Sequence, residues 1–226
     1  MNNKKHIVIY SHGFGVRKDD NGLLSDIASA LPEVDSILFD YYEVDEVKQT
    51  LTTCSFSEQA EKLTKVISET RLANPDATID LVAHSQGTIV AALANPEGIR
   101  KAIFLATVFD VSLGRTLERY KLNPGAVINL DGDSIFPSLT TGLTKIIPAR
   151  YWKERAETKS FEAYNNFSEK TEIIFIEANQ DQLLPKVDLS ELSSKTKVIY
   201  LDGNHGFEGE ARELLIKVIR EEIKLS

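Results

Sequence analysis

Short apolar runs alternate with longer segments in which apolar residues recur at helical spacing. The runs predict strands that are buried on both faces of a sheet, at 7–10, 36–40, 78–83, 101–106, 171–176 and 197–201. The longer segments predict helices, at 22–31, 57–73, 86–94 and 209–223. Strands that alternate with helices indicate βαβ units and a six-stranded, mostly parallel sheet flanked by helices. We therefore predict a single α/β domain over residues 1–226.

The alternation breaks between residues 111 and 168, where glycine and proline recur. One helix is predicted there, from Pro148 through Ala163, and residues 41–45 farther upstream are predicted to be loop. An irregular insertion of this length is usually functional or poorly ordered, so we interpret residues 111–168 as a small lid. Its apolar side chains would either line an acyl pocket or pack the lid onto the domain: Phe136, Leu139, Leu143, Ile146, Ile147, Tyr151 and Trp152.

The composition is that of an ordinary globular protein, with 42% hydrophobic and 27% charged residues. The formal net charge of -8 argues against a nucleic-acid partner, because binding to phosphates needs a basic face. The one cysteine, Cys54, can form neither an intrachain disulfide nor a thiolate metal site. No apolar stretch is long enough for a signal peptide or a membrane span. We therefore expect a cytoplasmic protein without a membrane partner.

A serine follows the third predicted strand at a tight turn. The turn reads Ala83-His84-Ser85-Gln86-Gly87, and small helix-forming residues follow at once. This is a variant of the G-x-S-x-G turn, with Ala83 in place of the first glycine. A serine in such strained backbone needs small neighbours, which Ala83 and Gly87 supply. The alternative is an N-cap serine that opens an ordinary helix.

A serine nucleophile needs a base, and the chain has four histidines. His6 precedes the first strand, and His12 lies in a glycine loop where a structural hydrogen bond suits it. His84 adjoins Ser85, but neighbours on a tight turn point in different directions. His205 lies in a glycine-flanked loop after the last strand, where an imidazole is reachable. We therefore predict that His205 is the base.

Four acidic residues near strand ends could orient that histidine. Asp181, in a loop just past the fifth strand, is the predicted acid, and Asp110, past the fourth strand, is the serious rival. Glu177 is closer to its strand, where its side chain would point into the sheet. Asp202 would shape the turn before the histidine.

Backbone N–H groups near the serine would stabilise the negative charge of a transition state. The N–H of Gln86 lies at a predicted helix N-terminus and is one expected donor. The loop after the first strand, with Gly13 and Gly15, would supply the other donor from Phe14. The alternative is that these glycines only turn the chain. A phosphate-binding loop fits less well, because the spacing matches neither common phosphate motif.

Together these motifs resemble the α/β-hydrolase superfamily, in particular its compact esterase- and lipase-like members. The matching segments are the glycine loop at 12–15, the serine turn at 83–87, the acid loop at 179–185 and the histidine loop at 203–206. Ser85, Asp181 and His205 follow in the family order of serine, acid, histidine. Ala83 departs from the motif, a substitution that also occurs among small lipases and esterases of this fold. The resemblance implies the sheet order 2-1-3-4-5-6, with strands numbered along the chain.

The function that the resemblance implies is hydrolysis of a small to medium carboxylic ester, thioester or amide through an acyl-enzyme on Ser85. This chemistry needs no metal or organic cofactor. We expect a small-molecule ester as the partner, with His12, Tyr151 and Trp152 as candidate substrate contacts. Two alternatives stay open: a binding or sensing module of the same fold, and an acyltransferase. An intact triad argues against the first, since a binding module has no need for three aligned polar residues.

Overall fold

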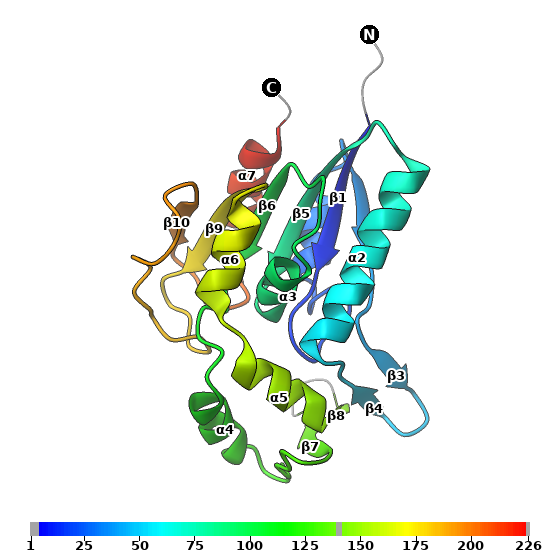
Figure 1. The fold of residues 1–226 in the computed structure, drawn as a ribbon, viewed down its shortest axis with the longest axis vertical. Helices are drawn as coiled ribbons and strands as arrows, with labels where there is room; N and C mark the ends of the chain where they lie inside the picture. The colour runs from blue at the N-terminus through cyan, green and yellow to red at the C-terminus, as the bar shows by residue number, and fades with distance from the viewer. Residues whose placement is uncertain (1–4, 139–141, 225–226) are drawn as a thin grey trace.

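A six-stranded parallel sheet forms the centre of the molecule (Figure 1), in the order β2-β1-β5-β6-β9-β10. The computed structural model describes residues 5–138 and 142–224. The strands are β1 (His6–Ser11), β2 (Asp35–Leu38), β5 (Thr78–His84), β6 (Lys101–Leu105), β9 (Glu172–Ala178) and β10 (Lys197–Leu201). When these strands are numbered along the chain, the order is 2-1-3-4-5-6. The predicted fold class and strand order are therefore confirmed.

Helices cover both faces of this sheet, because its central strands are apolar on both sides. In β1, Ile7 and Ile9 pack into the core that includes α2 (Phe56–Ala73), α3 (Gln86–Ala94) and α6 (Ser160–Ser168). Val8 and Tyr10 pack into a second core with α1 (Leu23–Ser29) and α7 (Glu210–Ile223). Figure 1 shows α2, α3 and α6 together in front of the sheet. The unbroken apolar run in the sequence reflects this burial on both faces.

Residues 43–52 form a short hairpin, so the prediction of loop for residues 41–45 is wrong in part. β3 (Glu43–Asp45) pairs antiparallel with β4 (Thr50–Thr52). Strands of this length are too short to show a periodic pattern. Helix α2 also begins before the predicted start at Ser57. Ser55 is its N-cap, and Glu58 completes a capping box that satisfies two backbone N–H groups.

The described part of the predicted insertion forms regular elements. After α4 (Leu113–Lys121) come β7 (Ser134–Pro137) and β8 (Thr144–Ile147), which join the hairpin in a second sheet of order β3-β4-β8-β7. The single helix predicted from Pro148 through Ala163 is wrong. Extended backbone at Thr158 and Lys159 divides it into α5 (Ala149–Glu157) and α6. The break allows α6 to pack against α3, whereas α5 contacts α2 and α4.

The second sheet, α4 and α5 lie beyond the carboxyl ends of the central strands, where the arrows of Figure 1 end. Parallel α/β sheets bind ligands at this end. Residues 1–4, which were predicted to hold no signal segment, and Leu139 lie outside the described ranges. Within those ranges, no helix combines the length and the apolar character that crossing a membrane requires.

Candidate active site

The turn from β5 into α3 holds Ser85 in strained backbone. Its φ of 50° and ψ of -123° lie in a left-handed region that residues other than glycine rarely adopt. The Ser85 N–H donates to the carbonyl of Leu105 at 2.9 Å, and its carbonyl accepts from the N–H of Thr88 at 3.0 Å. A side chain at Gly87 would collide with the carbonyl oxygen of Ser11. The surrounding contacts therefore fix the strained turn and the position of its hydroxyl.

Ser85, His205 and Asp181 form a hydrogen-bonded chain. Ser85 Oγ lies 3.0 Å from His205 Nε2, and His205 Nδ1 lies 2.7 Å from Asp181 Oδ2. The backbone N–H groups of Leu183 and Leu184 donate to the other oxygen of Asp181. Because the carboxylate can only accept, Nδ1 of His205 carries the proton and Nε2 accepts from the serine hydroxyl.

The surroundings of this chain favour a neutral His205 and an ionised Asp181. Burial is the main cause that lowers the pKa of His205; the hydrogen bond to Asp181 opposes it, and the nearby charge of His84 adds to the lowering. Burial alone would raise the pKa of Asp181, but the hydrogen bond and charge of His205 outweigh it and lower that pKa. A neutral imidazole is the state that a general base requires.

The other acidic candidates accept hydrogen bonds from groups other than His205. Asp110 and Asp202 accept hydrogen bonds from neighbouring loop residues. Glu177 accepts from a backbone N–H, at 3.2 Å to each of its oxygens. Within the described residues, no hydrogen bond joins any of the three to His205. The structure thus brings Asp181, rather than Asp110, to the histidine.

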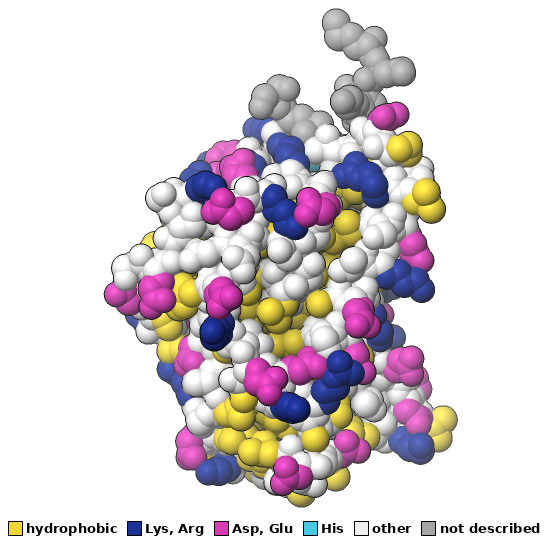
Figure 2. Space-filling view, in the orientation of Figure 1, with side chains coloured by type: hydrophobic (Ala, Val, Ile, Leu, Met, Phe, Trp, Pro, Cys, Tyr) yellow, Lys and Arg dark blue, Asp and Glu magenta, His cyan; other side chains and the backbone are white. Residues whose placement is uncertain are grey.

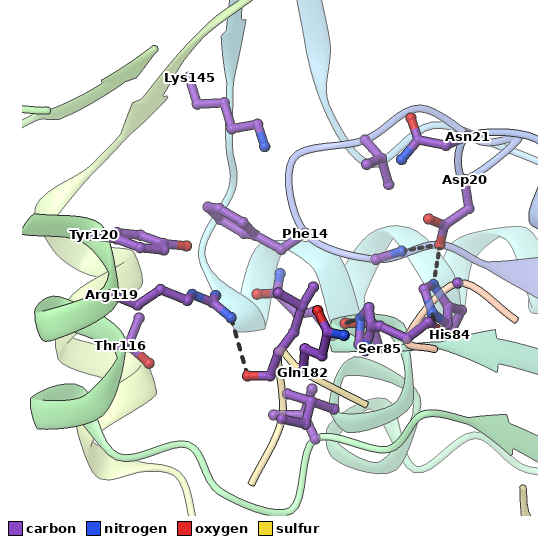
Figure 3. A pocket seen from close by; sticks show the side chains of 18 of the residues that line it. Phe14, Asp20, Asn21, His84, Ser85, Thr116, Arg119, Tyr120, Lys145 and Gln182 are labelled. Carbon is purple, nitrogen blue, oxygen red and sulfur yellow. Dashed lines mark hydrogen bonds and ion pairs between the residues drawn. The ribbon is translucent and has the colours of Figure 1, made fainter. Parts of the chain in front are cut away.

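His84 lies beside this chain and ties two loops together (Figure 3). Its Nδ1 lies 2.8 Å from Asp20 Oδ2, and its Nε2 lies 3.0 Å from the carbonyl oxygen of His205. Both partners are acceptors, so both ring nitrogens donate and the imidazole is positively charged. Burial opposes this charge, but Asp20 outweighs it and raises the pKa of His84. The same oxygen of Asp20 accepts from the N–H of Gly13 at 2.7 Å.

Sequence reasoning missed Asp20, because an acidic residue in a polar loop carries no periodic signal. Its two hydrogen bonds connect the glycine loop to His84, and His84 connects to the histidine loop. Asp20 and His84 therefore fix the glycine loop and the histidine loop relative to the serine turn. We regard Asp20 and His84 as positioning residues.

The glycine loop packs directly against the serine turn. A Cβ at Gly13 would lie 3.3 Å from the Cβ of Ser85, which leaves little room for any side chain there. Phe14 follows, and it lines the same cavity as Ser85 and Gln86. The role of the Phe14 and Gln86 N–H groups as oxyanion donors stays a prediction.

The side chain of Gln86 is anchored by three side chains from distant parts of the sequence, which fixes the start of α3. Its Oε1 accepts from the Tyr151 hydroxyl at 2.7 Å. Its Nε2 lies 3.0 Å from Gln59 Oε1 and 3.2 Å from the Tyr42 hydroxyl oxygen. The sequence pointed only to the backbone N–H of Gln86. The side-chain partners are distant in sequence, so no local pattern could reveal them.

Of the three predicted substrate contacts, Tyr151 lines the cavity and the other two do not. His12 is fully buried; its Nδ1 donates to a loop carbonyl at 2.9 Å, and its Nε2 accepts from the N–H of Tyr41 at 3.0 Å. Trp152 is also buried, and its Nε1 donates to Ser134 Oγ at 3.0 Å. These side chains fill core positions behind the cavity wall, so we correct their assignment from substrate contact to packing and support.

A cavity of about 730 Å³ opens in front of Ser85 and His205 (Figure 3), large enough for a small to medium ligand. Of the apolar lid residues singled out in the sequence, Phe136 and Tyr151 line it. Its lining also includes Phe14 and Tyr120, together with four cationic side chains: Arg212, which is paired with Asp26, and Arg119, Lys145 and Arg155. Among the described residues, no cluster of histidine, cysteine and acidic side chains is arranged to hold a metal ion.

Solved structures of low sequence identity share this architecture. Est1E from Butyrivibrio proteoclasticus, solved with ferulic acid bound, gives a TM-score of 0.73 at 15% identity over 98% of this chain and 90% of that protein. The monoacylglycerol lipase of Paleococcus ferrophilus gives 0.64 at 15% identity, over 96% and 93%. An alpha-beta serine hydrolase homologue from Coxiella burnetii gives 0.61 at 13% identity, over 97% and 85%. The chain has the α/β-hydrolase fold. At these identities the likeness establishes that fold, and the activity has to be argued from the site.

A family model described as the T6SS Tle3 phospholipase effector domain matches residues 43–103. This segment of the α/β-hydrolase fold contains the serine turn but spans less than half of the chain. A comparison with curated proteins gives no match.

Proposed function

We propose that this protein is a serine hydrolase that cleaves a carboxylic ester through an acyl-enzyme on Ser85. The observation that carries the proposal is the hydrogen-bonded chain from Ser85 through His205 to Asp181, which opens onto the cavity. The esterase and lipase among the structural neighbours favour an ester as the substrate class. A thioester or an amide would be attacked by the same route.

The first half of the reaction forms the acyl-enzyme. Ser85 Oγ attacks the carbonyl carbon while His205 Nε2 takes the hydroxyl proton. Asp181 stabilises the resulting imidazolium, and the N–H groups of Phe14 and Gln86 bind the oxyanion. Each such donor contributes on the order of 3 kcal/mol to the barrier reduction. His205 then passes the proton to the leaving alcohol as the carbon–oxygen bond breaks.

The second half releases the acyl group. A water molecule replaces the alcohol, His205 takes one of its protons, and the hydroxide attacks the acyl carbonyl carbon. The bond to Ser85 Oγ breaks, the serine regains its proton from His205, and a carboxylic acid leaves.

The charged His84 assists both halves of the reaction by acting on the protonation of His205. Its ring centroid lies 4.9 Å from that of His205. A positive charge so close disfavours resting protonation of His205, which keeps the base available. It also makes the transient imidazolium more ready to give its proton to the leaving group.

The test is hydrolysis of p-nitrophenyl esters of graded acyl length by the parent and by Ser85→Ala. We expect the parent to cleave at least one ester and the variant to lose about a thousandfold or more in kcat, because the nucleophile is gone. Ser190→Ala changes an exposed serine outside the cavity and serves as the matched control, with parent activity expected. Parent-like activity of Ser85→Ala, or no cleavage of any ester by the parent, would contradict the proposal.

A further inference from the structure

The cavity wall across from Ser85 carries three positive side chains. Arg119 comes from α4, Lys145 from β8 and Arg155 from α5, and all three line the cavity. Figure 3 shows Arg119 and Lys145 extending towards the space beside Phe14, with Ser85 on the other side. The elements that carry them are far apart in sequence, so their convergence is a product of the fold.

These three cations have no carboxylate partner. Within the described residues, none of them takes part in an ion pair. By contrast, Lys121 on the same helix as Arg119 lies 2.7 Å from Glu118, and Arg150 on α5 lies 2.7 Å from Glu154. Figure 2 likewise shows side chains of both signs interspersed over the face in view. What sets Arg119, Lys145 and Arg155 apart is that they line one cavity together.

Arg155 is the buried member of these three cations. It is only 8% exposed, and its Nη2 donates to the Thr116 hydroxyl at 3.1 Å. Its Nε is buried without a hydrogen-bond partner. A buried guanidinium with an unsatisfied N–H is unfavourable unless an anion compensates its charge.

Gly15 in the glycine loop leaves the space that the Lys145 side chain occupies. Gly15 has φ of 65°, and a Cβ there would lie 2.8 Å from Lys145 Nζ and closer still to its Cδ and Cε. The absent side chain thus leaves the space that the lysine occupies. Its Nζ lies 5.6 Å from the centroid of the Phe14 ring, beside the residue proposed to bind the oxyanion. Burial and the charge of Arg119 both lower the pKa of Lys145, as expected of a cation without a counterion.

The acidic residues that line the cavity are engaged elsewhere. Asp20 accepts from His84 and from a backbone N–H. Glu208 lies 2.7 Å from the side-chain nitrogen of Asn204, on the side of the histidine loop. Neither compensates the three cations. A ligand that enters between the two walls therefore meets positive charge on one side and the catalytic chain on the other.

We propose that the substrate of this hydrolase is an ester that carries an anionic group, a carboxylate or a phosphate, bound by the cavity cations Arg119, Lys145 and Arg155. The inference rests on the proposed ester hydrolysis and adds the chemical class of the substrate. The net charge of -8 would repel such a ligand from the chain as a whole. Binding of an anion therefore requires the local cluster. The rings of Phe14, Tyr120 and Tyr151 line the remainder of the cavity, where they suit an apolar part of the ligand.

The test compares two esters that differ only in charge. The carboxylate probe is mono-p-nitrophenyl adipate, and its neutral match is methyl p-nitrophenyl adipate. After correction for the uncatalysed rates, we expect kcat/KM to favour the anion by about tenfold or more. Lys145→Met and Arg119→Met should each reduce that ratio several-fold. Lys121→Met removes a positive charge from α4 outside the cavity and should leave the ratio unchanged.

A second pair distinguishes the two sources of anionic charge. A hexanoyl ester of glycerol 3-phosphate is compared with monohexanoylglycerol. For each pair, kcat/KM for the anionic ester is divided by kcat/KM for the neutral one, and the larger ratio identifies phosphate or carboxylate as the better anion. Calorimetry of adipate and of glycerol 3-phosphate with Ser85→Ala measures binding without turnover.

Cleavage of the neutral esters with no preference for either anion would overturn this inference and leave the proposed function standing. Absence of all cleavage would overturn the proposed function, and calorimetry would still decide the anion site: binding weakened by Lys145→Met supports it, and no binding contradicts it.

Discussion

At the residue scale, the site depends on two histidines in opposite protonation states. His84 donates from both nitrogens to acceptors, whereas His205 donates to Asp181 and accepts from Ser85. Asp20 keeps His84 protonated, whereas burial and the charge of His84 keep His205 neutral. The two rings act as one unit, because each state depends on the charge of the neighbour.

The pH dependence of activity should report this coupling. A base must be unprotonated, so kcat/KM is expected to rise with pH through the pKa of His205, which lies below 6.5. Asp20→Asn removes the charge that keeps His84 protonated. His205 then loses a positive neighbour, whose lowering of the His205 pKa exceeds the opposing effect of the Asp20 charge, so the midpoint of the acidic limb should move to higher pH. A merely structural role for Asp20 would lower the rate without moving the midpoint.

The matched control for this measurement is Asp19→Asn, in the same loop but exposed. The midpoint of the acidic limb of kcat/KM should be the same in this variant as in the parent. An unchanged midpoint in Asp20→Asn, with activity retained, would contradict the coupling of the two histidines.

The sequence allowed Ser85, His205 and Asp181 to be singled out, because each lies in a short loop after a strand whose apolar run is unambiguous. Asp20 and the side-chain network of Gln86 could not be found in this way. Their partners are brought close only by the folded chain, and no spacing along the sequence encodes them.

At the element scale, the central strands could be predicted because they are buried on both faces. The second sheet could not be predicted because its strands are short. β3, β4, β7 and β8 have three or four residues each, too few to show alternation. The division between α5 and α6 was missed because the residues at 158 and 159 are ordinary helix formers or weak breakers. Tertiary packing of α6 against α3 decides the break.

The end of β9 contains a titratable group that should make stability depend on pH. Burial raises the pKa of Glu177 from 4.5 to about 7. The folded state therefore binds the proton more tightly than the unfolded chain, and stability is lost as pH rises across that window. Glu177→Gln has no charge to bury, so it should be more stable than the parent near pH 8 by roughly 3 kcal/mol. Below pH 4.5, where Glu177 is protonated in both the folded and the unfolded chain, the difference should vanish.

Urea unfolding at the two pH values measures this difference. Glu191→Gln, an exposed acid-to-amide change, is the control and should unfold like the parent at both. Equal stabilities of Glu177→Gln and the parent at the higher pH would show that the folded state accommodates the charge of Glu177 without penalty.

At the scale of the whole molecule, the site is the meeting point of two parts. The central sheet supplies Ser85, His205 and Asp181, and the elements after residue 111 supply the opposite wall with its three cations. The sequence predicted that residues 111–168 would cover the site, but it could not predict the charge of the cavity. Arg119, Lys145 and Arg155 lie on three separate elements, and only the fold places them around one space.

The most direct measurement of the central claim is covalent labelling by a fluorophosphonate probe, read by mass spectrometry of the intact protein and of its peptides. A serine hydroxyl reacts with such a probe only when a neighbouring base activates it. The account predicts one adduct on the folded protein, on the peptide that contains Ser85, and none on Ser85→Ala or on the denatured parent. A folded parent that stays unlabelled, or an adduct located on another residue, would contradict the account.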